Sequence, residues 1–112
     1  MRIESKKQGN LDIIRLHGLL AGADTETFEA NIRKRIDDGA KEIVLDMSGV
    51  IFVDSRGLEA MLDLAELQIR NGRTLKLAGV SGMLQEVLDL TELAAMFEPC
   101  KDPQFAVVGG QP

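Results

Sequence analysis

The chain has 112 residues, 45% of them hydrophobic, and a net charge of −5, which fits one soluble globular domain over residues 1–112. An acidic chain is repelled by nucleic-acid phosphates and anionic lipids, and aromatic residues are only 4% of the sequence, so we expect neither nucleic acid nor direct membrane contact. A single cysteine, the lack of a signal peptide and the lack of a long apolar run together predict a cytoplasmic location.

After an initial hairpin, the hydrophobic pattern alternates between strands and helices. Gly9 and Asn10 form a turn signal between two short strand-like runs. Further on, Phe28, Ile32 and Ile36 recur at every fourth position, which is typical of a helix face. The expected elements are strands at 2–7, 11–16, 42–46, 74–78 and 96–100, helices at 24–38, 55–71 and 81–90, and a final helical turn opening at 102–103.

Residues at the ends of these helices fit the usual capping preferences. Asp24 or Thr25 can cap the first helix, and Ser81 can cap the third, because a side-chain oxygen accepts bonds from the free N–H groups of a first turn. Gly39 and Gly72 fit the points where the first and second helices end.

The helix over 55–71 has the strongest amphipathic pattern. Leu64 and Leu67 fall on a second side of it, where either another helix of the domain or an exposed partner surface would accommodate them. The residues that share the predicted core stripe are Leu58, Met61, Leu62, Ala65 and Ile69.

This order of elements predicts an α/β fold. We expect a mostly parallel mixed sheet of four to five strands packed with three to four helices, and Pro99 suits only an edge strand. Binding sites in such folds tend to lie beyond the carboxyl ends of the strands, where the segment 47–54 is expected to form a loop.

Support for a catalytic, cofactor or metal site is weak. His17 and Cys100 are the only histidine and cysteine, and nothing in the sequence places them together as base and nucleophile. The glycines in 79–83 lack the spacing of a phosphate-binding loop, and no residues have metal-ligand spacing. We therefore expect neither enzymatic activity, such as that of a small hydrolase, nor a bound metal or cofactor.

Polar residues gather between the best strand and the best helix. Asp46, Ser48, Asp54 and Ser55 cluster there, and two readings are open. Asp and Ser are favoured before helices simply as caps, and they also suit a functional surface. On the functional reading, we expect Ser55 to be exposed at the helix start or within one residue of it.

The particular string of residues in this region favours the functional reading. The run from Leu45 to Leu58, LDMSGVIFVDSRGL, resembles the signature of the STAS domain, a family that includes bacterial anti-sigma factor antagonists. The segments 16–20 and 87–91 also resemble parts of this family. In antagonists of this type, an anti-sigma factor that is itself a serine kinase phosphorylates the serine of the motif, and a serine phosphatase restores it. The unphosphorylated form binds the kinase and frees the sigma factor.

The resemblance implies that Ser55 is the phosphoacceptor of a protein-binding switch. Arg56 stands where the family usually has a small hydroxyl residue and could pair with a phosphate, and Glu92 stands where a glycine is usual. A homodimer and nucleotide binding stay open. The residues expected at the partner surface are Asp46, Ser48, Asp54, Arg56, Gly57, Leu64 and Leu67.

An alternative within the same fold family is an accessory subunit of a membrane transport system. In that role the domain would dock on a membrane protein or an ATPase, and Ser55 would not be modified. The identity of neighbouring genes, either a kinase-like anti-sigma factor or a transporter, would separate the two functions.

Overall fold

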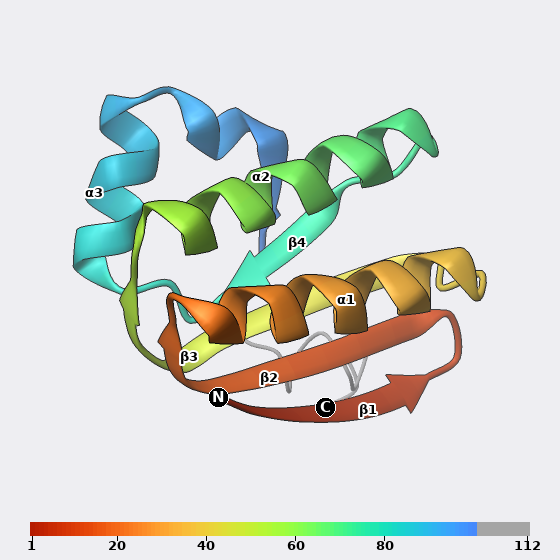
Figure 1. Ribbon diagram of the computed structural model, residues 1–112. Helices are drawn as coiled ribbons and strands as arrows, with labels where there is room; N and C mark the ends of the chain where they lie inside the picture. Colours follow the sequence, from red (N-terminus) through yellow and green to blue (C-terminus); the bar gives the residue numbers. More distant parts are fainter. Residues whose placement is uncertain (101–112) are drawn as a thin grey trace, which may run out of the picture.

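The order of strands and α-helices along the chain is the predicted one, and a short 3-10 helix that was not predicted precedes the last strand. A computed structural model describes residues 1–100, so the helical turn expected at 102–103 lies outside the described residues. The elements in chain order (Figure 1) are β1 (Arg2–Gln8), β2 (Leu11–Leu20), α1 (Ala23–Asp37), β3 (Glu42–Val53), α2 (Ser55–Arg70), β4 (Leu75–Ala78), α3 (Gly82–Leu90), the 3-10 helix η1 (Leu93–Met96) and β5 (Phe97–Pro99).

The five strands form one sheet in the order β1-β2-β3-β4-β5. β1 pairs with β2 in antiparallel fashion through the predicted hairpin, and the remaining neighbours are parallel. Pro99 lies on the edge strand β5, as predicted, where its missing N–H costs no ladder hydrogen bond. The expected mixed, mostly parallel sheet is therefore confirmed.

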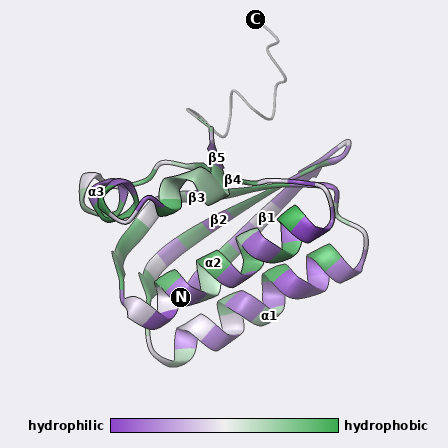
Figure 2. Ribbon diagram, turned by 90° about the horizontal axis from the view of Figure 1, so that it is seen from above, coloured by the Kyte–Doolittle hydropathy of each residue, from purple (hydrophilic) through white to green (hydrophobic). Residues whose placement is uncertain are grey.

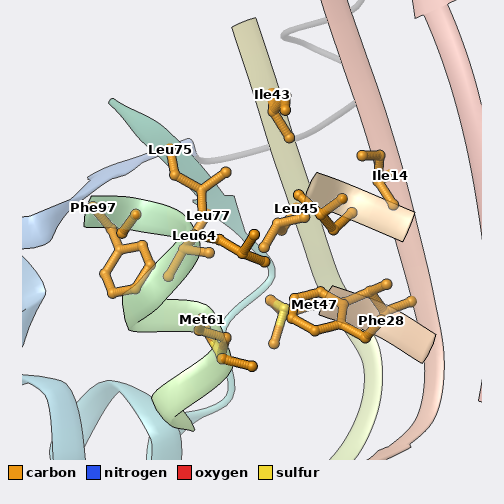
Figure 3. Close-up of a cluster of buried hydrophobic side chains, with 14 of the residues drawn as sticks. Ile14, Phe28, Ile43, Leu45, Met47, Met61, Leu64, Leu75, Leu77 and Phe97 are labelled. Atoms are coloured by element: carbon orange, nitrogen blue, oxygen red, sulfur yellow. The ribbon is translucent and has the colours of Figure 1, made fainter. Parts of the chain in front are cut away.

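Two helices cover one face of this sheet. α1 and α2 lie side by side on it, and α3 lies beyond the start of α2 (Figures 1 and 2). The core fills the space between these helices and the sheet (Figure 3). Its largest fully buried side chains include Phe28 of α1, Met61 of α2 and Met47 of β3. No helix within residues 1–100 has the length and apolar character needed to cross a bilayer.

The start of α1 differs from the prediction. Neither Asp24 nor Thr25 caps the helix; its N-cap is Gly22, which makes no side-chain cap bond. Gly22 has a φ of 56°, so the chain turns into the helix through a left-handed residue. Asp24 instead accepts a hydrogen bond from the N-terminal ammonium group of Met1 at 3.1 Å, and Thr25 is buried.

The segment 47–54, predicted as a loop, is mostly strand. β3 continues to Val53 because β2 continues to Leu20 beside it, and the two pair as far as Leu20 with Val53. The pairing register shifts between Arg15 and His17 and again between Gly18 and Leu19. Register irregularities of this kind bend a strand pair.

The buried face of α2 is rotated from the predicted stripe. Ile69 is 49% exposed, whereas Leu64, predicted on the second side, is fully buried. Leu58 and Leu62 are half-buried and pack against the core. The buried residues of α2 are Gly57, Ala60, Met61, Leu64, Ala65 and Gln68.

The predicted cap of α3 is confirmed, since the Ser81 hydroxyl accepts a hydrogen bond from the Leu84 N–H at 3.4 Å. Glu92, two residues after the helix ends, has a φ of 61° and is the one non-glycine residue with a positive φ in residues 1–100. A left-handed conformation costs an L-residue roughly 1–2 kcal/mol, which explains why glycine suits this position better.

Candidate functional site

Ser55 is the first residue of α2 and is exposed, as predicted. It follows directly on Asp54, the N-cap of the helix, and stands where β3 has just ended. The first N–H groups of a helix have no partner within the helix, and together they carry a partial positive charge. The Ser55 hydroxyl is therefore presented to solvent at a position that favours a negative charge.

Asp54 connects the start of α2 to the neighbouring backbone through hydrogen bonds. One carboxylate oxygen accepts a hydrogen bond from the Gly57 N–H at 2.7 Å, and the other accepts one from the Gly22 N–H at 3.1 Å. These two bonds hold the pKa of Asp54 below its ordinary value. The Asp54 N–H in turn donates to the Leu20 carbonyl at 3.2 Å. Asp54 thus joins the start of α2 to the end of β2 and to the turn before α1.

Gly57 permits a close approach of α2 to the end of β2. A Cβ added there would lie 2.2 Å from the Leu20 carbonyl oxygen, far inside van der Waals contact. Gly57 is buried and therefore offers no exposed surface to a partner, contrary to the prediction.

Asp46 does not lie on an exposed surface with Ser55 as predicted, whereas Ser48 is exposed. Asp46 is almost fully buried and accepts a hydrogen bond from Arg15 Nε at 2.7 Å. The Ser48 hydroxyl, although its residue is exposed, also donates to Asp46, at 2.7 Å. Burial raises the pKa of Asp46, but the bonds from Ser48 and Arg15 outweigh it and leave the pKa below its ordinary value. Asp46 is therefore a buried structural ion-pair partner.

The remaining predicted partner residues also include both buried and exposed side chains. Leu64 is fully buried in the monomer, so packing within the domain accommodates it, and Leu67 is half-buried against the core. Arg56 is exposed, and its guanidinium reaches Glu26 of α1 at 3.3 Å. An exposed pair of this kind contributes little to stability, which leaves Arg56 able to exchange partners.

A groove of about 420 Å³ opens beside Ser55. Three segments form it: the end of β3, the start of α2 and the first turns of α3. Its walls are mainly apolar, while Asp54, Ser55 and Ser81 supply polar groups. The apolar lining residues are Met47, Val50, Ile51, Phe52, Val53, Leu58, Met83, Leu84 and Val87.

The four exposed residues of this apolar lining were not among those expected at the partner surface: Ile51, Phe52, Met83 and Val87. Ile51 is 82% exposed and Met83 is 73% exposed, and the other two are also exposed. The available signals were the apolar residues near the motif serine and the apolar i, i+4 pair of Met83 and Val87 on the third helix. Only the folded chain shows that these two groups line one groove.

His17 and Cys100 have different surroundings. His17 Nε2 lies 2.5 Å from Glu4 Oε1 on β1. Cys100 packs against the small apolar cluster of Ile13, Val44 and Ala78.

Comparison with known proteins agrees with this geometry. The family model of the STAS domain matches residues 2–106. BtrV of Bordetella bronchiseptica, named as a candidate anti-sigma factor antagonist, is 25% identical over 97 residues, which cover 87% of this chain and 84% of BtrV.

Two solved structures share the fold. A candidate anti-sigma factor antagonist from Thermotoga maritima superposes with a TM-score of 0.85 at 18% identity, covering 98% of this chain and 95% of that chain. The Bacillus cell fate determinant SpoIIAA in its phosphorylated form gives a TM-score of 0.79 at 20% identity, covering 98% of this chain and 100% of that chain.

The family match spans every described strand and helix, and the fold is the one that the family resemblance implied. The chain therefore belongs to the STAS domain family, among its members that resemble anti-sigma factor antagonists.

Proposed function

We propose that this protein is an anti-sigma factor antagonist controlled by phosphorylation of Ser55. Its partner is an anti-sigma factor with serine kinase activity, which the unphosphorylated form binds, and a serine phosphatase reverses the modification. The protein acts in the cytoplasm as one domain over residues 1–112 and has no catalytic activity of its own.

The observation that carries this proposal is the position of Ser55. Its hydroxyl is exposed at the first residue of α2, where a kinase can reach it, and it borders the apolar groove. The solved phosphorylated form of SpoIIAA, which shares the fold, supports a phosphate as the control.

A phosphate on Ser55 would change the surface without opposing the fold. It adds roughly −1.5 to −2 charges at pH 7, and the start of a helix favours an anion. A partner that covers the groove would have to desolvate this dianion beside the Asp54 carboxylate, which lowers affinity.

The test is phosphate transfer from ATP by a kinase-like anti-sigma factor encoded beside this protein, followed by mass spectrometry. We expect one phosphoryl group on the wild-type chain and none on Ser55→Ala. Ser48→Ala is the matched control and should accept phosphate as the wild type does, because Ser48 donates to the buried Asp46. Phosphate on Ser55→Ala would place the acceptor elsewhere.

The same partner separates this function from the transport alternative. Titration calorimetry should show weaker binding for Ser55→Glu than for the wild type, and unchanged binding for Ser55→Ala. If the wild type and Ser55→Glu bind equally and no phosphate is incorporated, the phosphorylation switch is wrong. That result would favour an accessory subunit of a transport system.

A further inference from the structure

α3 has an apolar face that no other element of residues 1–100 covers. Met83, Val87 and Leu90 recur at i, i+4 and i+7, so they form one stripe along the helix. All three are exposed, Leu90 at 79%, while Leu84 and Leu88 bury the neighbouring side of α3 in the core. The stripe is continuous with the groove, because Met83 and Val87 line both.

The facing wall of the groove is also apolar and exposed. Ile51 and Phe52, near the end of β3, stand across the groove from α3. Exposed side chains on two elements that flank a concave apolar surface are the usual arrangement for receiving a helix. Isolated surface hydrophobics need no such explanation, but contiguous ones often mark an interface.

The charges beside the stripe are all acidic. By helical spacing, Glu86 lies along the edge of the stripe that is remote from the groove, and Asp89 lies further around the helix on that same side; both are exposed. The basic residues of α2, Arg56 and Arg70, already pair with Glu26 and Glu66, and α3 has none. A second copy of this chain would bring the same acidic edge and a charge of −5 to the interface, so self-association here is opposed by repulsion.

We propose that the groove and the α3 stripe receive an amphipathic helix of the partner with one basic edge. Its apolar side chains lie on Met83, Val87 and Leu90 and enter the groove beside Ile51 and Phe52. Its Lys or Arg side chains lie over Glu86 and Asp89, on the side away from Ser55. This inference builds on the proposed function by naming the chemistry of the partner segment.

This arrangement also explains why phosphorylation of Ser55 would weaken partner binding and not strengthen it. The basic edge of the docked helix pairs with Glu86 and Asp89, and its apolar side covers the groove up to Ser55. A phosphate on Ser55 would then be covered by the apolar side of the docked helix, which brings it no cation, and the cost of its desolvation would weaken docking.

The test uses synthetic helical peptides of about 15 residues, a length at which an isolated helix becomes marginally stable. One has a leucine stripe and a lysine edge, a second has glutamate at that edge, and a third has the composition of the first in scrambled order. Their affinity for the unphosphorylated protein is measured by fluorescence anisotropy. We expect the lysine-edged peptide to bind about tenfold more tightly than either of the others.

Two matched substitutions locate the binding surface. Ile51→Ser should weaken binding of the lysine-edged peptide about tenfold, because it removes an apolar anchor from the groove. Ile69→Ser makes the same chemical change at an exposed position of α2 outside the groove and should leave binding unchanged. Circular dichroism melts of both variants show whether they are folded. In Glu86→Gln/Asp89→Asn, the preference for the lysine edge over the glutamate edge should be lost.

Three results would overturn the inference: equal binding of the scrambled peptide, equal loss in the two serine variants, or a dimer in sedimentation that Ile51→Ser abolishes. None of these measurements requires phosphorylation. Peptide binding without phosphate uptake at Ser55 would therefore reject the phosphorylation switch and keep the helix-binding groove. Phosphate uptake at Ser55, together with unchanged peptide binding by Ile51→Ser, would keep the phosphorylation switch and reject the helix-binding groove.

Discussion

At the start of α2, Gly57 is the residue whose replacement the packing tolerates least. A Cβ there would meet the Leu20 carbonyl oxygen at 2.2 Å and the Leu20 side chain at 3.0 Å, and the carbonyl belongs to backbone that cannot rotate away. Gly57→Ala must therefore move α2 away from β2. We expect it to lower the free energy of unfolding by about 1–3 kcal/mol, as overpacking does in other cores, and urea denaturation measures this.

Gly82 supplies the matched control for this substitution. It is the first residue of α3, and nothing lies within 4 Å of a Cβ added there. Gly82→Ala should be neutral or slightly stabilising, since alanine has the higher helix propensity and restricts the unfolded chain. Similar destabilisation by both alanine variants would show that the loss comes from helix ends in general and not from the contact with Leu20.

For α2 as an element, the Asp54 cap makes stability depend on pH. The pKa of Asp54 is lowered in the folded chain by the N–H groups of Gly57 and Gly22, so the folded state binds this proton less readily than the unfolded state. The stabilisation is fully present above the unfolded pKa of about 3.9 and is lost as pH falls through the folded pKa. Asp54→Asn should therefore be less stable than the wild type at neutral pH, with a gap that closes in acid.

The measurement is the urea midpoint of both proteins between about pH 3 and pH 7. Asp46 also has a lowered pKa, but it is unchanged in both proteins, so its contribution cancels from the difference. A gap that stays constant across this range would mean that Asp54 acts through its shape and not through its charge.

Hydrophobic periodicity was enough to predict where each helix lies, but not which face of α2 is buried. Apolar residues extend around much of α2, which packs on both the sheet and α1. Gln68 lies within the buried face, fully buried, with no hydrogen-bond partner for its amide. A polar residue at that place shifts the apparent stripe toward Leu58, Leu62 and Ile69, since the pattern assumes that polar side chains are exposed.

The candidate site was predicted in part for a related reason. The position of Ser55 depends on local signals, a strand followed by a capping residue and a helix, and these are readable along the chain. The groove joins Ile51 to Met83, 32 positions further along the sequence, so it depends on how β3 and α3 are placed in the fold. Asp46 was misplaced because a single polar residue in an apolar strand gives no sign that Arg15, an exposed residue of β2, reaches it with its guanidinium.

In the molecule as a whole, the residues that stabilise the start of α2 and the residues proposed to bind a partner lie on different sides of it. Asp54 and Gly57 face the neighbouring backbone and hold the helix in place, whereas Ser55 and the groove face solvent. Substitution at Ser55 should therefore separate stability from binding. We expect Ser55→Glu to change the free energy of unfolding by less than about 0.5 kcal/mol, because an acidic group in the first turn of a helix is favourable.

The same Ser55→Glu substitution should weaken partner binding, because the new carboxylate lies at the rim of the groove and must be desolvated there. Ser5→Glu is the matched control: it adds the same charge at an exposed position of β1 and should leave partner affinity unchanged. Thermal melts and titration calorimetry of the two variants give both quantities. If Ser5→Glu weakens binding as much as Ser55→Glu, total charge and not the groove rim decides affinity.

If Ser55 is phosphorylated as proposed, we expect Arg56 to affect how completely the phosphorylated form releases its partner. Its guanidinium now pairs with Glu26 at 3.3 Å, and both side chains are exposed, so a neighbouring phosphate can compete for it. Such a pair would partly neutralise the dianion and reduce its desolvation cost under a docked partner. Phosphorylated Arg56→Ala should therefore bind the partner more weakly than the phosphorylated wild type, while the two unphosphorylated proteins bind alike. Equal affinity of the two phosphorylated proteins would show that Arg56 stays with Glu26 and has no part in the switch.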